Sequence, residues 1–178
     1  MNNTPDLAIN GDTISDQLGC SVSSAGDINA DGFSDVLIGV SGADSSKGKV
    51  YVLLGGVSLN NVPDIILYGE NANDFFGCSV AGGGDLNNDG FTDVIAGASS
   101  FDSNKGRSYI FFGGTNMNSI PDAVLTGRNT NDVFGMSVAF AGDVNGDMLD
   151  DVIIGAPGYS TQTGAAYIYF GGTFMDST

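Results

Sequence analysis

The chain has 178 residues, of which 42% are hydrophobic, so it is long and apolar enough to form an ordinary packed domain. Its formal net charge is −16, from 21 acidic and 5 basic residues, which argues against nucleic acid or an anionic membrane surface as a partner. It contains no histidine, which excludes Ser-His-Asp triads, histidine acid–base catalysis and His-ligated zinc.

An acidic stretch occurs three times, beginning at Asp27, Asp85 and Asp143, with the same spacing of 58 residues each time. In each copy, side chains with hard oxygen atoms occupy alternate positions. In a loop that curls around a small centre, every second side chain points inward. Several oxygen ligands on one such loop favour calcium. The strict period indicates a repeat protein, with units over roughly residues 2–59, 60–117 and 118–175.

Each unit contains the same four apolar segments in the same order. A Pro-Asp segment predicts an edge strand, because proline lacks an N–H group. A strand of small residues follows, which is typical of strands that crowd around a common axis. After the acidic loop come an apolar run, which predicts a strand buried on both faces, and a last strand that ends at Gly-Gly. The segments are 5–9, 20–25, 36–39 and 49–54; 63–67, 78–83, 94–97 and 107–112; and 121–125, 136–141, 152–155 and 166–170.

Cys20, Cys78 and Met136 occupy equivalent positions in the three units. We interpret this slot as a small buried apolar site rather than a disulfide or a metal ligand. No stretch approaches the roughly 18 apolar residues of a membrane span, and residues 1–6 lack the pattern of a signal peptide. We therefore expect no membrane insertion.

Four short strands per unit, with turn glycines and no helical periodicity, predict an all-β fold. The arrangement is typical of a β-propeller of four-stranded antiparallel blades, three of which lie in this chain. A β-solenoid is the alternative, but its repeats are much shorter than 58 residues and would not explain the small-residue strand.

Two short motifs flank the acidic loops. Phe76-Gly77 and Phe134-Gly135 precede the small-residue strand, and Gly155-Ala156-Pro157 follows the buried one. Together with the acidic loops, these motifs resemble the FG-GAP repeat, which forms the β-propeller of integrin α subunits and also occurs in glycosylphosphatidylinositol-specific phospholipase D. The resemblance covers essentially the whole chain, although the first copy departs from both motifs with Leu18-Gly19 and Gly39-Val40-Ser41.

The resemblance implies that each acidic loop is a hairpin that binds calcium, with about three ions per chain. The ligands would be the side chains at loop positions one, three, five and nine and the backbone carbonyl at position seven. The side-chain ligands would be Asp27, Asn29, Asp31, Asp35, Asp85, Asn87, Asp89, Asp93, Asp143, Asn145, Asp147 and Asp151, and the carbonyl ligands would belong to Phe33, Phe91 and Leu149.

Two other interpretations of these loops are less favoured. An EF-hand is not expected, because Ile38 stands where its twelfth-position glutamate would be. Solvated turns would leave like charges about 4 Å apart, which repel by ~1 kcal/mol in water and ~4 kcal/mol at an effective dielectric near 20.

In the third loop, Met148 replaces the glycine of position six. If that position needs a positive φ, methionine costs about 1 kcal/mol, and the third site should bind more weakly.

The number of blades predicts an assembly. Propellers close with roughly 4–8 blades, whereas this chain has three. The chain starts with an outer strand at 5–9 and ends with a three-stranded blade at 136–170. We expect a homodimer that closes a six-bladed ring, in which each N-terminal strand completes the partner's last blade. The alternative is a fragment of a longer repeat array.

The expected function is a calcium-stabilised scaffold that recognises a protein or a glycan, as integrin-like propellers do in adhesion. Acids at the same place in every repeat indicate a structural task rather than an active site, so we expect no enzyme activity. The alternatives are an accessory domain of a larger enzyme similar to the phospholipase D, or a lectin that stacks sugars on tyrosines. The tyrosines are Tyr51, Tyr109, Tyr159 and Tyr167; for all of them except Tyr159 we prefer a packing role.

The calcium sites also bear on location. Open calcium sites fill at extracellular calcium levels, so we expect an extracellular or cell-surface location.

Overall fold

The computed structural model describes residues 3–172, which form eleven strands and three short helical turns. The strands are β1 (Leu18–Gly26), β2 (Asp35–Val40), β3 (Lys49–Leu53), β4 (Ile65–Tyr68), β5 (Phe76–Gly84), β6 (Asp93–Ala98), β7 (Arg107–Phe111), β8 (Ala123–Thr126), β9 (Ser137–Gly142), β10 (Asp151–Ala156) and β11 (Ala165–Tyr169). The helical turns are α1 (Ala43–Ser46), α2 (Phe101–Asn104) and α3 (Tyr159–Gln162).

The strands form three antiparallel sheets, which we call blades 1, 2 and 3. Blade 1 has the order β1-β2-β3-β4, blade 2 the order β5-β6-β7-β8, and blade 3 the order β9-β10-β11. The predicted all-β fold is confirmed, and in every unit the small-residue strand, the buried strand and the last strand follow one another in the predicted order. Within residues 3–172, blade 3 has three strands, as predicted, and the blades do not close into a ring.

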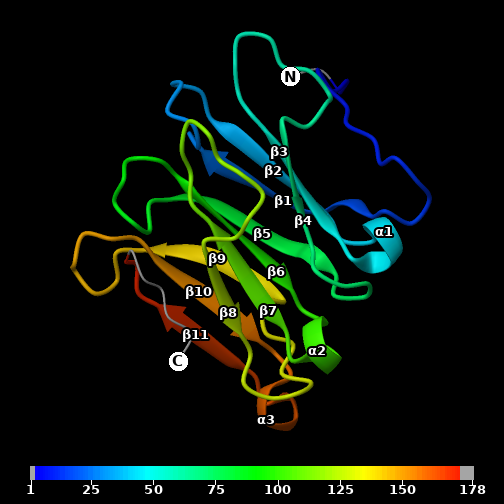
Figure 1. Ribbon diagram of the computed structural model, residues 1–178, viewed down its shortest axis with the longest axis vertical. Coiled ribbons are helices and arrows are strands. Elements are labelled where there is room, and N and C mark those ends of the chain that lie inside the picture. Colours follow the sequence, from blue (N-terminus) through cyan, green and yellow to red (C-terminus); the bar gives the residue numbers. More distant parts are fainter. Residues whose placement is uncertain (1–2, 173–178) are drawn as a thin grey trace.

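The blades lie side by side in chain order, from blue through green to red in Figure 1. Strand β5 of the middle blade contacts β1 on one side and β9 on the other. The hairpin loops that carry the acidic stretches project from one end of the blades, whereas α1, α2 and α3 lie at the opposite end (Figure 1). In the part of the chain that the structure describes, no helix is long and apolar enough to span a membrane.

The prediction of a strand at residues 5–9 is wrong for this structure. Residues 7–11 run past blade 1 without strand pairing, and Ile9 packs instead on a cluster that contains Ile38, Val40 and Tyr51. The equivalent strands β4 and β8 pair with the last long strand of the preceding unit. Within residues 3–172, no strand pairs with the segment at 7–11, and a strand without a pairing partner is unstable.

The interpretation of the Cys20, Cys78 and Met136 slot as a buried apolar site is also wrong. Cys20 is exposed, Cys78 is half-buried, and Met136 is 52% exposed. The slot lies close to the next blade, because Cys20 Sγ is 3.4 Å from the carbonyl oxygen of Gly77. Since three blades do not enclose an axis, this part of the inner strands stays accessible to solvent.

The hydrophobic core lies between the blades. Each blade has a trailing face, which packs on the next blade, and a leading face, which packs on the preceding one. The central residues of the trailing faces of blades 1 and 2 and of the leading faces of blades 2 and 3 are buried, with partly buried side chains around them. In blades 1, 2 and 3 respectively, the centre of the trailing face is Leu37 and Val52, Ile95 and Ile110, and Ile153 and Ile168. In the same order, the centre of the leading face is Val36 and Ile38, Val94 and Ala96, and Val152 and Ile154.

The two glycine motifs meet where neighbouring blades touch. Gly77 and Gly135 have φ of +80° and +82°, a backbone conformation that favours glycine. Their carbonyl oxygens lie against Gly39 and Gly97 of the preceding blades: a Cβ at Gly39 would be 2.1 Å from Gly77 O, and one at Gly97 would be 2.0 Å from Gly135 O. The glycines of both motifs therefore allow the backbones of adjacent blades to approach closely.

The helical turns form a second contact between blades, which the sequence pattern did not predict. In α1, Asp44, Ser45 and Ser46 all have positive φ, between 53° and 62°. This backbone presents its carbonyl groups to the next blade, where Asn73 N–H donates to Ser45 O at 3.1 Å and Phe75 N–H donates to Ser46 O at 2.9 Å. A segment of four residues has no periodicity, so its sequence could not reveal it.

Candidate metal sites

The first acidic loop joins β1 to β2, and its side chains fold back onto its own backbone. The N–H of Asp31 donates to both Asp27 Oδ1 and Asn29 Oδ1, each at 3.1 Å, and the N–H of Gly32 donates to Asp27 Oδ2 at 2.8 Å. Because two side-chain oxygens share one donor, positions one and three converge, as their alternate spacing predicts. Asn29 Nδ2 donates to Asp31 Oδ2 at 3.0 Å, which brings position five into the same group.

The second and third loops repeat this arrangement. Asp89 N–H donates to Asp85 Oδ1 and Asn87 Oδ1, each at 3.1 Å. In the third loop the N–H of Asp147 donates to the equivalent oxygens at 3.1 and 2.9 Å. The geometry is thus a property of the repeated sequence, and it brings together positions one, three and five of every loop. The equivalent oxygens of the third loop are Asp143 Oδ1 and Asn145 Oδ1.

The aspartate at position nine has a different environment. Asp35 is 1% exposed; its Oδ2 accepts the N–H of Ile28 and its Oδ1 that of Gly55, both at 2.7 Å. This carboxylate therefore ties the loop to the backbone just after β3. Asp93 and Asp151 make the equivalent pairs of hydrogen bonds, at 2.7 to 2.9 Å.

Burial dominates the electrostatics of this position. It raises the pKa of Asp35 above its ordinary value, even though two N–H groups act in the opposite direction. For Asp93 the same desolvation raises the pKa to about 7. The negative charges of positions one and five add to the shift in both loops.

Position seven takes part through its backbone. The N–H groups of Phe33, Phe91 and Leu149 donate to the position-five carboxylate of their own loop at 2.9 to 3.0 Å. The structure thus places the predicted carbonyl-ligand residues directly beside the side chains of position five.

Positions four and six of each loop have a left-handed backbone. At position six, Gly32 and Gly90 have φ of 91° and 87°, and Met148 has φ of 73° with an 83% exposed side chain. The requirement for a positive φ is therefore met in the third loop by a methionine. At position four the residues are Ala30, Asn88 and Gly146, with φ of 58°, 57° and 82°.

Adjacent loops also contact each other. The N–H of Thr92, at position eight of the second loop, donates to Asp27 O at 3.4 Å, and the N–H of Asp150 donates to Asp85 O at 3.2 Å. Asp150 Oδ2 additionally accepts the N–H of Asp85 at 2.9 Å. The three loops form a connected row along one end of the molecule (Figure 1).

The donor chemistry of the loops suits a hard cation, although the full ligand set does not converge on one point. Within residues 3–172, no three Asp, Glu, Cys or His side chains come close enough together to hold a metal ion. What converges in each loop is two carboxylates and one amide, all oxygen donors of the kind that calcium prefers. The recorded ion pairs of this part of the chain, Lys49–Asp44 and Arg107–Glu70, lie outside the loops.

A second set of aspartates, to which the sequence analysis gave no role, closes the turn before each inner strand. Asp16 is 7% exposed and accepts the N–H of Thr13 at 2.9 Å and the hydroxyl of the same residue. The hydrogen bonds from Thr13 lower the pKa of Asp16. Asp74 and Asp132 accept equivalent bonds from Asn71 and Asn129. The signal was present in the repeated Asp-x-x-Gly spacing at residues 16–19, 74–77 and 132–135.

The tyrosines considered as sugar-stacking surfaces are mainly packed. Tyr51 and Tyr109 are 4% and 3% exposed, and Tyr167 packs against Phe134 at a ring-centroid distance of 5.7 Å, which confirms the preferred packing role. Tyr51 OH donates to Asp12 Oδ2 at 2.9 Å; burial, followed by this bond, raises the pKa of Tyr51 to about 12. Tyr159 is half-buried beside Tyr167.

Comparison with known proteins agrees with this repeated geometry. The model of the FG-GAP repeat matches three segments, residues 21–53, 76–111 and 134–169, which correspond to the long strands of the three blades. Among curated relatives, integrin alpha-5 of Xenopus laevis is 35% identical over 165 residues, and integrin alpha-2 of Mus musculus is 38% identical over 167 residues; each alignment covers 85% of this chain. The phosphatidylinositol-glycan-specific phospholipase D of Homo sapiens is 31% identical over 177 residues, or 88% of this chain.

The chain corresponds to a small part of each of these relatives. It spans 16% of integrin alpha-5, 14% of integrin alpha-2 and 21% of the phospholipase D. Three matched repeats in three blades, with the flanking glycines at the contacts between blades, account for most of the described chain. The chain belongs to the FG-GAP repeat family and is homologous to the integrin alpha subunits.

Proposed function

We propose that the chain is a calcium-stabilised scaffold that recognises another protein or a glycan, and that the calcium is structural. The observation that carries this proposal is the threefold recurrence of one loop geometry. In each loop, oxygens from positions one and three accept the same N–H group of position five, and the position-five carboxylate accepts the side-chain amide of position three. All three loops lie at the same end of the molecule (Figure 1).

The chemistry of the loops supports calcium over other ions. Calcium takes six to eight oxygen ligands at relaxed geometry, and a loop of carboxylates, an amide and a carbonyl can supply most of them. In the first loop these would be Asp27, Asn29 and Asp31, the carbonyl of Phe33, and Asp35 at the base. When bound, the ion would supply positive charge among carboxylates that otherwise repel one another. Each loop uses mainly its own residues, so the ion would hold a hairpin rather than a substrate.

Recognition is the proposed use of the surfaces that the scaffold presents. The named relatives include several integrin alpha subunits, which suggests an adhesion or recognition role and an extracellular or cell-surface location. Rigid blades can hold surface loops in fixed positions, as binding sites on other scaffolds require.

The match to a phospholipase D leaves a second candidate, in which the blades are an accessory part of a larger enzyme. The chain spans only 21% of that protein, so its activity is not transferred to this chain. The repeated acids occupy equivalent positions in all blades, which suits a repeated structural task better than a single active site. A lectin is less favoured because Tyr51 and Tyr109 are buried. A glycan array and a phosphodiesterase assay on the chain would separate these alternatives.

The first prediction is that calcium stabilises the protein. We expect a chelator to lower Tm and added calcium to restore it, because an ion that binds only the folded state stabilises it by about 2.7 kcal/mol per site at one hundred times Kd. Calorimetric titration of the chelated protein should give about three ions per chain, with the third loop weakest. No heat of binding together with an unchanged Tm would contradict the proposal.

A loop variant makes this test specific. The double substitution Asp85→Asn and Asp89→Asn retains the size of both side chains and removes two charges from the second loop. We expect the titration to lose one site while the other two remain. The control is Asp102→Asn in the exposed turn α2, which removes a charge away from the loops and should leave the number of sites unchanged.

A further inference from the structure

We propose that two copies of this chain close a six-bladed ring. The trailing face of blade 3 in each copy packs on the leading face of blade 1 in the other. The joint repeats, between chains, the contact that already joins blade 1 to blade 2 and blade 2 to blade 3 within the chain. The proposal does not depend on calcium binding, because it rests on the faces and edges of the blades.

Within residues 3–172, each face needed for this joint has an exposed apolar residue at its centre. Part of the leading face of blade 1 is covered by the N-terminal segment, because Ile9 packs on the cluster that contains Ile38 and Tyr51, and in the ring this segment would move to β11 of the other copy. On the leading faces, Val94 and Val152 are 0% exposed, whereas the equivalent Val36 of blade 1 is 43% exposed. On the trailing faces, Ile110 of blade 2 is 0% exposed, whereas Ile168 of blade 3 is 51% exposed. The two ends of the chain thus carry complementary halves of one apolar interface that is buried twice inside the molecule.

The backbone at both halves already has the conformation that the contact requires. Within the chain, Asn131 N–H donates to Ser103 O and Val133 N–H donates to Asn104 O, and all four residues have positive φ. Their equivalents at the free ends also have positive φ: on one side Ser15 and Gln17, at 74° and 57°, and on the other Thr161 and Gln162, at 59° and 73°. A positive φ costs free energy in non-glycine residues. Both ends of the chain nevertheless have the backbone conformation that forms these hydrogen bonds between blades 2 and 3.

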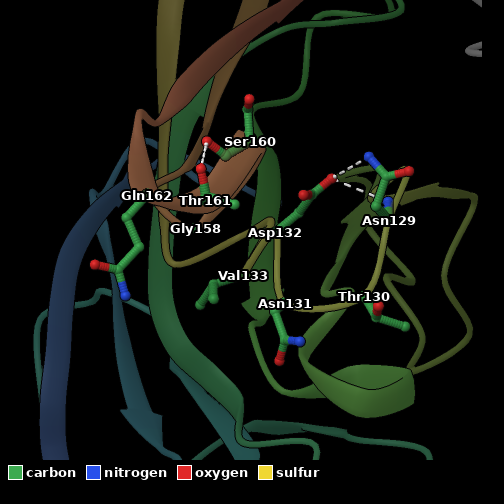
Figure 2. A pocket seen from close by; sticks show the side chains of 9 residues that line it. All are labelled: Asn129, Thr130, Asn131, Asp132, Val133, Gly158, Ser160, Thr161 and Gln162. Carbon is green, nitrogen blue, oxygen red and sulfur yellow. Dashed lines mark hydrogen bonds between the residues drawn. The ribbon is translucent and has the colours of Figure 1, made fainter.

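The surface of α3 shows where the partner would lie. Thr161 and Gln162 line a cavity of about 590 Å³ together with the linker at residues 129–133 (Figure 2). In blade 2, the equivalent residues of α2 are in contact with the linker of the next blade, and Asn104 Nδ2 donates to Asn131 Oδ1 at 3.3 Å. In the ring, residues 13–17 of the partner copy would take that place.

Other contacts between blades extend to the joint in the same way. Gly114 N–H donates to Ile28 O at 2.8 Å and Gly172 N–H donates to Leu86 O at 2.7 Å. At the joint, this bond would run from Gly56 of one copy to Val144 of the other. Ser21 and Ser79 donate through their hydroxyl groups to the motif glycine of the next blade at 2.8 and 2.7 Å, and Ser137 would donate to Gly19.

The ring also provides a sheet edge for the N-terminal segment. Strand β3 pairs with β4, and β7 pairs with β8, but within residues 3–172 the outer edge of β11 has no partner strand. Residues 7–10 are the repeat equivalents of β4. In the register of β3 and β4, Ile9 would pair with Ala166 and Leu7 with Ile168 of the other copy. The segment that forms no strand in one chain would thus complete blade 3 of its partner.

The number of blades selects a dimer. A head-to-tail contact between identical chains makes either a closed ring or an open fibre. Chains of three blades give rings of six, nine or more, and propellers close with roughly 4–8 blades, so six is the number that fits. A closed ring covers every apolar face and the open edge of β11, which would otherwise invite aggregation.

Sedimentation equilibrium of the purified 178-residue chain tests the assembly directly. We expect one species of twice the 18.1 kDa chain mass, with and without calcium. A monomer at all concentrations would overturn the proposal. Species that grow with concentration beyond the dimer would overturn ring closure.

The substitution Gly155→Ala should weaken the contact between the two copies without disturbing the fold of either copy. Within one chain, a Cβ at Gly155 meets only Ser137, whose side-chain Oγ, at 2.3 Å, can rotate away. In the ring, the same Cβ would face the backbone of Gly19 in the partner, as Gly39 and Gly97 face theirs. We expect the Kd of the dimer to rise about a hundredfold or more, with unchanged circular dichroism of the monomer. Gly97→Ala should instead destabilise the fold, and Ile120→Asp, at a 72% exposed isoleucine in a loop, should leave the dimer intact.

A mixing experiment tests the head-to-tail geometry. Val36→Asp blocks the leading face of blade 1, and Gly155→Ala blocks the trailing face of blade 3. Each variant alone has two damaged joints per ring, but a mixed pair has one intact joint. We expect each variant to be monomeric at concentrations where the mixture forms mixed dimers. If the Val36→Asp variant dimerises by itself, the joint does not use the leading face and the proposal fails.

Discussion

At the scale of the residue, left-handed backbone positions explain several features of the repeat. Position six of the acidic loop has φ of 91°, 87° and 73° in the three copies, so its conformation is kept even where methionine replaces glycine. Met148 N–H still donates to Asp143 Oδ2 at 2.9 Å, as Gly32 N–H does to Asp27. The side chain of Met148 is 83% exposed, so it adds strain without contributing packing.

Met148→Gly should therefore raise the free energy of unfolding by about 1 kcal/mol, the ordinary cost of a non-glycine residue in this region. The reciprocal change Gly32→Met should lower it by a similar amount. Urea denaturation in the presence of a chelator measures the free energy of unfolding of both variants without a contribution from metal binding. Equal stability of Met148→Gly and the parent chain would show that the third loop relaxes in some other way.

At the scale of the element, the buried aspartate of position nine connects each hairpin to the strand behind it. Asp151 is 0% exposed, and its two oxygens accept the N–H groups of Val144 and Gly171, each at 2.9 Å. The first bond belongs to the loop, and the second to the backbone just after β11. This carboxylate holds the loop in place whether or not an ion is bound.

Asp151→Asn should destabilise the protein by about 1–3 kcal/mol in chelator, because an amide has one acceptor oxygen and would leave one buried N–H group facing its NH2. The matched control is Asp147→Asn in the same loop, an exposed position where the change should stay within about 0.5 kcal/mol. Thermal or urea unfolding of both variants makes the comparison. Equal losses in the two variants would mean that the buried bonds are not what holds the loop.

At the scale of the whole molecule, charge works against the fold. The net charge is −16, and the recorded ion pairs of the described residues involve only Lys49 and Arg107. The acidic loops lie side by side at one end, so their mutual repulsion is concentrated there (Figure 1). Self-repulsion of this kind destabilises a compact state and is screened by salt.

In chelator, we expect Tm to rise as sodium chloride is increased from about 0.01 M to about 0.15 M, because the Debye length falls from about 30 Å to about 8 Å. With calcium bound, the loops would be partly neutralised and the rise should be smaller. Scanning calorimetry at fixed protein concentration measures both series. A Tm that is independent of salt in chelator would show that repulsion between the loops is unimportant.

The sequence by itself determined the elements that depend on local chemistry. The 58-residue period, the apolar runs and the turn glycines were sufficient to predict the long strands of every blade, and the alternate oxygens of Asp27, Asn29 and Asp31 predicted their convergence. These features could be read because neighbours in the chain decide them: the period of side chains along a strand, the φ of a glycine and the reach of an aspartate to its own loop.

Only the tertiary structure decided the features that depend on the neighbouring blade. Residues 5–9 have the sequence of a strand but form none, because within residues 3–172 no strand edge pairs with them. Cys20 has the side chain of a core residue but is exposed, because three blades leave their inner strands open. The burial of Asp35 and the left-handed turns of α1–α3 likewise depend on contacts between segments distant in sequence. Strand pairing and burial each require two segments in contact, and the sequence of one segment describes only one side of that contact.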